Sequence, residues 1–341
     1  MASTIHDVAR LAGVSAGTVS RVLNDSPRVD PRTRARVLQV IEDLDFRPSS
    51  LARRLSTGKT RTVAVVSPYF TRPSVVERLR GIAAILSSVD YELLVFNVET
   101  AQQRDHALDL LSRGSHIDGL LLVGLDPSDA EVARIERAAL ACVLIDASHP
   151  RLAAIVGDDV SGGKLAVRHL HELGHRRIAF VAEMPREAFS KPASSLRLRG
   201  ARLESRAAGI AQPAEYLAVG EQGRGRAREM VSALLALPVP PTGIICTSDM
   251  QAMGALEAAR DAGRAIPDEL SIVGYDDLDI ATYLGLTTIR QPLFESGMEG
   301  ARILVSQLNG APRRARRRRL KIELVRRTST GPRPGGDPEP A

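Results

Sequence analysis

The chain has 341 residues, 44% of them hydrophobic, which allows two or three folded domains and excludes an intrinsically disordered protein. Only 3% are aromatic and none is tryptophan, so a ligand site would have few rings for stacking. The net charge is +6, with 11 basic against 6 acidic residues in 1–61, 9 against 1 in 313–327, and an acidic remainder. This distribution predicts a polyanionic partner for the amino-terminal segment.

Membrane segments and disulfides are not expected. The amino terminus MASTIHDVAR lacks the apolar core of a secretory signal and no apolar run approaches membrane-spanning length, which predicts a cytoplasmic protein with no membrane partner. Cys142 and Cys246 lie far apart in apolar runs, which predicts two buried thiols in a reducing compartment. No cofactor is predicted.

Residues 1–45 predict three short helices. The residues that begin the helices are Thr4 with Asp7 in a capping box, Ser15, and Asp30 before Pro31, and those that end them are Gly13 and Asn24-Asp25. Apolar residues recur at helical spacing along these helices: Val8, Ala9, Leu11, Ala12, Val19, Val22, Leu23, Val37, Val40, Ile41 and Leu44. Two helices around a short turn, braced by a third, predict a helix-turn-helix. A plain structural bundle is the alternative, and the basic charge favours DNA binding.

From Thr62 the pattern changes to short apolar runs that alternate with amphipathic stretches. Such runs are typical of parallel strands covered on both faces by helices. We predict strands at TVAVVS, YELLVFNV, GLLLVG, ACVLID, IAFVA, GIICTS and LSIVGY, and helices at 75–89, 104–113, 162–173, 225–237 and 250–262. This region, about 265 residues, exceeds one doubly wound sheet, so two subdomains are predicted.

Three other segments have their own predictions. FRPSSLARRLSTGKT should hold a helix too short to be stable alone in water, which therefore needs a partner. RRARRRRLKIELVRR, at 313–327, should be a solvated basic loop that leads into an alternating strand, LKIELV. The proline- and glycine-rich tail, 331–341, should be disordered.

The pentapeptide HELGH, His171 to His175, matches the H-E-x-x-H pattern of zinc hydrolases. Gly174 should end the helix, so His175 could not share a face with His171, and no third ligand follows at a suitable spacing. We interpret HELGH as a helix carboxyl end, where His175, Arg176 and Arg177 suit the negative end of the helix dipole. GEQGRG at 220–225 lacks the Lys-Ser/Thr of a phosphate-binding loop, and no nucleophile–base pair is evident, so neither an enzyme nor a metal site is predicted.

The first 60 residues resemble a known family. TIHDVARLAGVSAGTVSRVLNDSPRVDPRTRARVLQVIEDLDFRPSSLARRLSTGKT is similar to the DNA-binding head and hinge of the lactose-repressor (LacI/GalR) family of bacterial transcription regulators. The body is similar at VGDDVSGGKLAVRHLHELGHRRIAF, RLRGA, TSDMQAMGALEAARDAG and ELSIVGYDDLDIATYLGLTTIRQP. The resemblance covers roughly residues 4–330.

The resemblance implies an all-α helix-turn-helix head joined by a hinge helix to an α/β, periplasmic-binding-protein-like body of two doubly wound parallel-sheet lobes. The expected parts are the head at 1–45, the hinge and linker at 46–60, one lobe at 61–158 with 289–320, and the other at 159–288 with 321–330. Such a regulator, most often a repressor, binds a palindromic double-stranded operator as a homodimer. The tail has no leucine heptads, so no tetramer is expected.

By resemblance, the second helix enters the major groove. Ala16 and Gly17 would occupy the positions that vary with operator sequence, and Arg21 would pair with guanine. Glycine in a helix costs about 1 kcal/mol relative to alanine, so Gly17 suggests a close backbone approach to DNA; a tolerated surface glycine is the alternative. Short polar side chains would hold phosphates, namely Thr4, Ser15, Thr18, Ser20 and Asn24.

The hinge would bind differently. In the family, two hinge helices meet in the minor groove, where a leucine from each wedges between base steps. Here that leucine is Leu55, with Leu51 and Ala52 facing the partner hinge and Arg53 beside the phosphates.

The resemblance also implies a sugar-like effector in the cleft between the lobes. The implied residues are Asp146, Arg197, Ser248 and Asp276, because carboxylates and arginines can each make two hydrogen bonds to vicinal hydroxyls. Turn capping is the alternative for the two aspartates. Tyr69, Phe70 and Arg72 follow a strand in a loop that departs from the family pattern, and Arg72 would allow a phosphorylated sugar. A transport-class sugar-binding protein and a regulator with a vestigial cleft remain alternatives.

Overall fold

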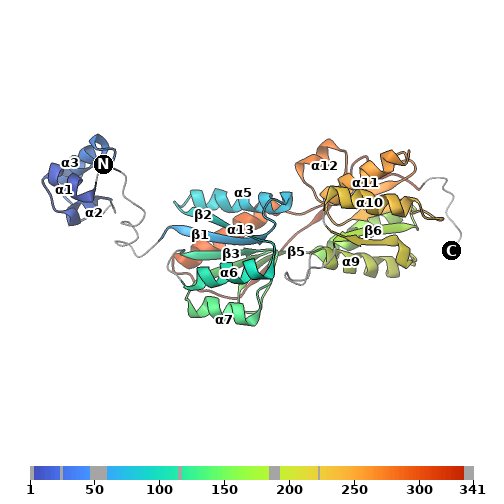
Figure 1. Ribbon diagram of the computed structural model, residues 1–341, viewed down its shortest axis with the longest axis horizontal. Coiled ribbons are helices and arrows are strands. Elements are labelled where there is room, and N and C mark those ends of the chain that lie inside the picture. The colour runs from blue at the N-terminus through green and yellow to red at the C-terminus, as the bar shows by residue number, and fades with distance from the viewer. Residues whose placement is uncertain are drawn as a thin grey trace. The chain divides into compact units, whose positions relative to one another are not determined.

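The computed structural model describes residues 4–23, 26–46, 60–113, 117–183, 193–221 and 223–333. It contains two compact units, a helical head at the amino terminus and an α/β body that begins at Thr62 (Figure 1). The predicted hinge helix lies outside the described residues, as do Asn24, Leu51, Ala52, Arg53 and Leu55. In the described part of the chain, no helix is both long and apolar enough to cross a membrane.

The head consists of α1 (Ile5–Ala12), α2 (Ala16–Leu23) and α3 (Pro31–Asp43), and the predicted caps at Thr4, Ser15 and Asp30 are confirmed. Thr4 and Asp7 form a capping box, and Asp30 accepts a hydrogen bond from the backbone N–H of Thr33. Gly13 ends α1 at φ 62°, where a side chain would be strained. The buried core is Val8, Ala9, Ala12, Val19, Val22, Val37 and Phe46. Leu11, another apolar residue of the first helix, is 53% exposed.

The body is built on two six-stranded sheets with helices on both faces (Figure 1). Sheet A has the order β2-β1-β3-β4-β5-β11 and is parallel throughout. Sheet B has the order β7-β6-β8-β9-β10-β12 and is antiparallel only at β12. This arrangement confirms the predicted fold class of a helix-turn-helix head with an α/β body.

The first lobe is sheet A with its helices, and the second lobe is sheet B with its helices. The strands of sheet A are β1 (Thr62–Pro68), β2 (Glu92–Val98), β3 (Gly119–Val123), β4 (Ala141–Ile145), β5 (Ala153–Gly157) and β11 (Arg317–Leu320). Its helices are α5 (Pro73–Ser87), α6 (Ala101–Arg113), α7 (Asp129–Arg137) and α13 (Leu293–Leu308). The strands of sheet B are β6 (Ile178–Glu183), β7 (Leu217–Gly220), β8 (Gly243–Cys246), β9 (Ser271–Asp276), β10 (Thr287–Arg290) and β12 (Glu323–Val325). Its helices are α8 (Asp159–Glu172), α9 (Ala193–Ala207), α10 (Arg224–Leu235), α11 (Asp249–Asp261) and α12 (Asp279–Tyr283).

The chain crosses between the lobes at residues 157–159, 290–293 and 320–323. Because β10 runs to Arg290, sheet B continues two residues beyond the crossing expected at 288–289. Cys142 and Cys246 are buried free thiols, as predicted.

Glycines set the closest helix contacts in each lobe. A Cβ on Gly163 of α8 would lie 1.9 Å from the carbonyl oxygen of Arg197 in α9. A Cβ on Gly81 of α5 would lie 2.0 Å from the carbonyl oxygen of Phe294 in α13. These helices therefore pack backbone against backbone, and this fixes the positions from which Arg78 on α5 and Arg197 on α9 reach the space between the lobes.

Two strand predictions are wrong. YELLVFNV was expected to be buried on both faces, but β2 is an edge strand in which Leu94 is 42% exposed. LKIELV was expected to be one strand after a basic loop, but Arg317–Leu320 already pair with β5, and the chain crosses to sheet B before β12. Parallel pairing with β5 gives hydrogen-bond partners to a backbone whose first three side chains are exposed arginines, and no side-chain periodicity indicates this.

The prediction of a disordered tail from residue 331 is wrong for its first three residues. The backbone N–H of Gly331 donates to Ser271 Oγ (3.1 Å), and that of Arg333 donates to the carbonyl oxygen of Leu173 (2.9 Å). These bonds hold Gly331–Arg333 against the second lobe. The remaining tail residues lie outside the described part of the chain.

Candidate functional site

The exposed face of α2 presents Gly17 and Arg21, one helical turn apart. Val19 and Val22 are buried on the opposite face, so packing of the head leaves these two residues facing outward. A Cβ on Gly17 would meet only Ser15 Oγ, at 3.7 Å, which is ordinary contact. The fold of the head therefore does not require glycine at this position. Ala16 and Ser20, on the flank of this face, are half-buried.

Several of the predicted phosphate-binding groups already bond within the head. The Ser15 hydroxyl accepts from the backbone N–H of Thr18 (3.1 Å) and lies 3.0 Å from the Thr18 hydroxyl. The Thr4 hydroxyl donates to Asp7 Oδ2 (2.7 Å) within the capping box. These bonds set the rotamers at the amino-terminal ends of α1 and α2, so a phosphate would meet side chains that are already oriented.

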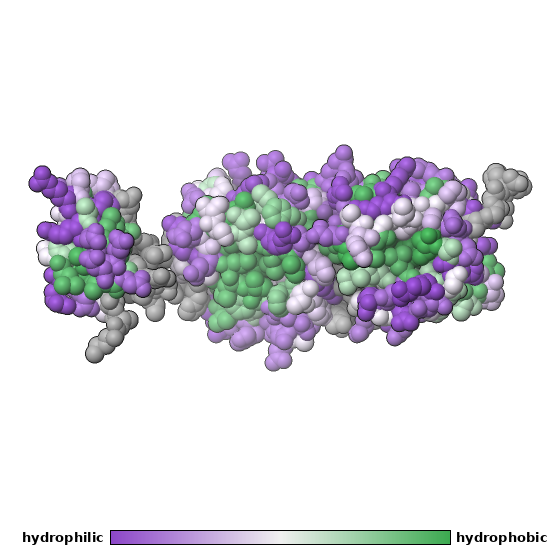
Figure 2. Space-filling model, turned by 90° about the horizontal axis from the view of Figure 1, so that it is seen from above, coloured by the Kyte–Doolittle hydropathy of each residue, from purple (hydrophilic) through white to green (hydrophobic). Residues whose placement is uncertain are grey.

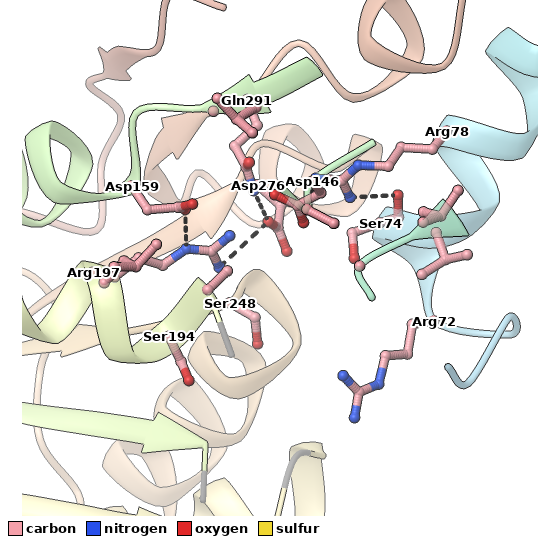
Figure 3. A pocket seen from close by; sticks show the side chains of 18 of the residues that line it. Arg72, Ser74, Arg78, Asp146, Asp159, Ser194, Arg197, Ser248, Asp276 and Gln291 are labelled. Carbon is pink, nitrogen blue, oxygen red and sulfur yellow. Dashed lines mark hydrogen bonds and ion pairs between the residues drawn. The ribbon is translucent and has the colours of Figure 1, made fainter. Parts of the chain in front are cut away.

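A polar cavity of about 190 Å³ lies between the lobes of the body. Its lining comes from the carboxyl ends of strands in both sheets and from the amino-terminal turns of α5, α8, α9 and α11, where open α/β sheets bind ligands. The charged lining residues are Arg72, Arg78, Asp126, Asp146, Asp159, Glu183, Arg197, Asp276 and Arg317. Six of these nine are labelled in Figure 3, in which Arg197 and Arg78 enter from opposite sides of Asp276.

Arg197 is the most constrained side chain of the cavity. Its Nε donates to Asp159 Oδ1 (2.8 Å), its Nη1 donates to the carbonyl oxygen of Thr247 (2.6 Å), and its guanidinium stacks 3.7 Å from the Tyr275 ring centroid. Burial lowers the pKa of this group, but Asp159, Tyr275 and Asp276 more than offset the effect and raise it. The guanidinium is therefore a fixed positive charge with a fixed orientation.

Asp276 lies between the two buried arginines. Its Oδ1 accepts a hydrogen bond from Gln291 Nε2 (2.7 Å) and lies 3.8 Å from Arg197 Nη1 (Figure 3). Burial raises the pKa of Asp276 to about 6, although Arg197 and Arg78 lower it. The carboxylate thus carries a desolvation cost that its partners do not fully offset, so it can accept further hydrogen bonds.

Asp146 ends β4 and forms an ion pair with Arg78 Nη2 at 3.0 Å. Arg78 also donates from Nη1 to the carbonyl oxygen of Ser74 (3.0 Å). Its buried Nε has no hydrogen-bond partner among the described residues. Sequence reading missed Arg78, although an arginine at helical spacing between Val75 and Ile82, on the buried face of α5, could have identified it.

Arg72 forms an ion pair across the cleft. It precedes α5 in the first lobe, and its Nη2 donates to Glu183 Oε1, at the end of β6 in the second lobe, at 2.8 Å. The guanidinium also lies 4.4 Å from the Tyr69 ring centroid. Arg72 was predicted to offer its charge to an anionic ligand, but Glu183 already neutralises it. Phe70 is not part of the cavity lining: it is 39% exposed and its backbone N–H donates to Asn97.

Ser248 caps α11 by accepting from the backbone N–H of Gln251 (3.2 Å), and it lines the cavity. Beneath it, the buried Asp249 accepts from Thr288 Oγ1 (2.6 Å) and from the backbone N–H of Leu278 (2.8 Å). Burial and the nearby Asp276 raise the pKa of Asp249 to about 8. Asp249 thus ties the start of α11 to the loop that follows Asp276.

Backbone strain marks the same region. Tyr69 (φ 49°), Asp146 (φ 55°) and Asp276 (φ 119°) all have positive φ angles, which non-glycine residues rarely adopt. Each costs on the order of 1–3 kcal/mol and persists only where the surrounding structure enforces it. Three of the seven predicted effector residues therefore carry strain at the cavity.

The HELGH segment is not a metal site. α8 ends at Glu172, and His175 is buried, with Nδ1 3.0 Å from Thr242 Oγ1 and Nε2 3.1 Å from the carbonyl oxygen of Gly331. The interpretation of His175 as a charge at the helix dipole is wrong, because burial lowers its pKa and its ring bonds to neutral groups. Among the described residues, no cluster of three or more His, Cys, Asp or Glu could hold a metal ion.

Comparison with known proteins agrees with this arrangement. Residues 4–49 match bacterial regulatory proteins of the lacI family, and residues 167–330 match the periplasmic binding protein-like domain. The HTH-type transcriptional repressor CytR of Escherichia coli (strain K12) is 33% identical over 334 residues, which are 96% of each chain. The chain belongs to the lacI family of bacterial regulatory proteins. It is a DNA-binding transcriptional regulator.

Solved structures of transcriptional regulators match nearly the whole length of this chain. The transcriptional regulator CelR–cellobiose complex is 29% identical, with a TM-score of 0.71 over 96% of this chain and 99% of that chain. The lac repressor dimer bound to operator and the anti-inducer ONPF has a TM-score of 0.85 over 97% of this chain and 100% of that chain. Its identity is 24%, so this second likeness concerns the fold alone.

The raised pKa of Asp276 predicts a pH-dependent cost to stability. An acid with a pKa of about 6 when folded and 3.8 when unfolded destabilises the fold increasingly as the pH rises between these values. We expect Asp276→Asn to raise the free energy of unfolding by up to about 3 kcal/mol at pH 7.5 but only about 1 kcal/mol at pH 4.5. Denaturant unfolding at the two pH values measures the difference. Asp105→Asn, at an exposed position on α6, is the control and should show none. A pH-independent effect of Asp276→Asn would contradict the raised pKa.

Proposed function

We propose that this regulator is a repressor that binds a palindromic operator as a homodimer and is controlled by a small neutral polyhydroxyl effector in the cleft. The observation that carries the proposal is a helix-turn-helix head on the same chain as a two-lobed body with a polar cavity between its lobes. A transport-class binding protein would not need the head. We infer action in the bacterial cytoplasm, on the nucleoid when the regulator is bound to DNA.

The head would read DNA through the exposed face of α2. Arg21 can make a bidentate contact to guanine, and Gly17, which the head itself does not require, would let the backbone approach the base edges. Ala16 offers a methyl group for contact with thymine. Ser15, Thr18, Ser20, Thr4 and Asn24 would hold phosphates and set the register.

Substituting Arg21 and Thr18 distinguishes base recognition, which determines the sequence bound, from phosphate contacts, which position the head on the DNA. Arg21→Ala should cost about 1–3 kcal/mol on the operator and relax the preference at one base pair in each half-site. Thr18→Ala should weaken binding to operator and to random DNA by similar factors, because a phosphate contact carries no sequence information. Arg36→Ala, at an exposed position on α3, controls for the loss of one positive charge. Competition binding with a selected duplex and random duplexes measures these effects. Equal losses for both variants on both DNAs would contradict this docking of α2.

The effector is proposed to be neutral because the cavity leaves no positive charge in excess. Of the described lining residues, four are arginines and five are carboxylic acids: Arg72, Arg78, Arg197 and Arg317, with Asp126, Asp146, Asp159, Glu183 and Asp276. A phosphate would have to displace Glu183 from Arg72 or face this acidic surplus. A ring bearing vicinal hydroxyls could instead donate to Asp276 and Asp146 and accept from Arg197.

The volume of the cavity also favours a small sugar-like effector. A cavity of about 190 Å³ is below the roughly 300–1,000 Å³ of typical ligand pockets, which favours a single sugar ring. Among the described lining residues the aromatic side chain is that of Tyr69, and Arg72 already stacks on it. Recognition would therefore rest on hydrogen bonds more than on ring stacking.

A thermal-shift screen tests the effector proposal. Full-length protein is heated with a panel of pentoses, hexoses, nucleosides and the corresponding phosphates, and a neutral member should raise Tm while its phosphate does not. Arg197→Lys should reduce the shift strongly, because lysine cannot reproduce the fork that bonds Asp159 and Thr247. Arg168→Lys, at an exposed site on α8, is the matched control. Stabilisation by phosphates alone would contradict a neutral effector, and no response to any member would favour a vestigial cleft.

The hinge would couple effector binding in the cleft to operator binding by the head. Its residues lie outside the described part of the chain. We propose that Leu55 wedges between base steps, with Leu51 and Ala52 against the partner hinge and Arg53 on the phosphates. A helix this short needs that partner to form. An effector that changed the angle between the lobes would then change operator affinity, and operator would change effector affinity by the same factor.

A dimer is supported by exposed apolar side chains on the body. Val76 on α5 is 39% exposed, Leu94 on β2 is 42% exposed, and Tyr283 on α12 is 86% exposed. The face drawn in Figure 2, along which α5 and α12 run in Figure 1, carries hydrophobic surface on both lobes. Apolar surface of this kind on both lobes suits an interface with a second copy.

Light scattering tests the dimer. The wild type should have the mass of a dimer, and Val76→Glu combined with Tyr283→Arg should shift it to a monomer with unchanged secondary structure, because both charges would be buried against the partner. Val239→Arg, at a 55% exposed site in the loop after α10, controls for the added charge. A wild-type monomer, or a tetramer that persists after removal of residues 334–341, would contradict the proposal.

A further inference from the structure

The segment Arg313–Arg319, here called the basic segment, contains six arginines in seven residues and joins α13 to β11. Apart from Arg317, which lines the cleft, neither the cleft nor the helix-turn-helix accounts for these arginines. Like charges this close repel one another, so a binding partner of opposite charge would lower their free energy. The structure divides the segment into two parts with different surroundings.

The second part, which belongs to β11, is engaged by the body itself. Arg318 forms an ion pair with Glu299 of α13, and Arg319 donates to Asp158 Oδ2 at 3.2 Å. Arg317 contributes to the lining of the cleft. These three side chains therefore have acidic neighbours or a place in the effector site.

The first part, Arg313, Arg314 and Arg316, has no such acidic partners among the described residues. Arg313 Nη1 donates to a backbone oxygen, that of Ala139, at 2.8 Å. Arg314 and Arg316 are exposed, and no hydrogen bond or ion pair of their side chains occurs within the described ranges. Their charges face solvent.

Strand direction shows which end of the first lobe this first part lies near. β1, β3, β4, β5 and β11 are mutually parallel, so their amino-terminal ends all point away from the cleft. Because Ala153 pairs with Val143 and Arg317 pairs with Ala154, β5 and β11 begin further along the sheet, nearer the cleft, than β1, β3 and β4. β1 begins at Thr62, the first residue of the body after the hinge. The chain therefore enters the body at the end of the sheet where the basic segment begins, because Arg313 bonds to Ala139 just before β4; this end is here called the entry edge.

Neighbouring residues add to the positive charge of the entry edge. The bond from Arg313 to Ala139 places it just beyond the end of α7, whose last residue is Arg137. Glu136 is already paired with Arg151 at 2.8 Å. Asp118, the residue before β3, accepts from the backbone N–H groups of Thr60 (2.7 Å) and Arg61 (3.0 Å). These carboxylates of the edge are thus occupied, and the arginines are in excess.

We propose that Arg313, Arg314 and Arg316 form a second DNA-binding surface that contacts the phosphate backbone flanking the operator. The inference rests on the proposed function, since the chain that joins the DNA-binding head to the body enters the body at this edge. Exposed guanidinium groups suit phosphates, and they carry no sequence information. This surface raises affinity for operators within long DNA without changing which sequence is recognised.

The test compares two duplexes that share one operator, selected from random sequence by the wild-type protein. One duplex ends at the operator, and the other extends about two helical turns beyond it on each side. Arg314→Gln combined with Arg316→Gln should weaken binding to the long duplex about 10-fold at low salt. The slope of log K against log salt should become shallower by about 0.9 for each phosphate that the variant no longer binds. Affinity for the short duplex should not change.

Arg202→Gln combined with Arg206→Gln, at exposed positions on α9 of the second lobe, removes the same charge and should behave as wild type on both duplexes. Thermal melting and light scattering check that both variants are folded and have the wild-type mass. Wild-type affinity and slope on the long duplex would overturn the proposal. An equal loss of affinity for both duplexes would also overturn the proposal. So would a loss of self-association in place of a loss of DNA affinity, because it would assign the arginines to a protein partner. If the wild type selects no duplex at all, the proposed function fails before this comparison is made.

Discussion

The body depends on one constraint: a guanidinium buried between the lobes must be surrounded by opposite charge. Arg197 meets it through Asp159, the Thr247 carbonyl and Asp276, which come from α8, the end of β8 and the end of β9. Arg78 meets it from the other lobe through Asp146. Removing Asp146 would leave the buried Arg78 without its ion-pair partner, so a residue that shapes the cleft also contributes to its stability.

Close helix packing makes this charge arrangement possible. Gly163 and Gly81 bring α8 against α9 and α5 against α13, and the two arginines then project from rigid helices rather than from loops. The strained backbone at Asp146 and Asp276 is held in place by the same surroundings. A ligand would meet polar groups that are already oriented, and less ordering entropy would oppose its binding.

Charge also organises the outside of the molecule. The body is acidic apart from the basic segment, and the arginines of that segment separate according to where the chain runs. Those in β11 find Glu299 and Asp158, whereas those before β11 lie at the entry edge without acidic partners in the described part of the chain. The same run of arginines thus contributes to the body's own packing at one end and to a solvent-exposed basic surface at the other.

The sequence by itself determined the local elements and the family. The caps at Thr4, Ser15 and Asp30 and the apolar strands of the body could be predicted because capping and periodicity depend on residues close in the chain. Strands β5, β7 and β10 were not predicted, because runs of four or five residues carry little periodicity and tertiary packing decides them. Asp146, Arg197, Ser248 and Asp276 were predicted by resemblance. Only the tertiary structure brought Arg78, Asp159, Glu183 and Gln291 beside them, since these partners lie far apart in sequence. It also decided that Glu183 neutralises Arg72 and that the second part of the basic segment is a strand, because both depend on the crossings between lobes, which no local pattern encodes.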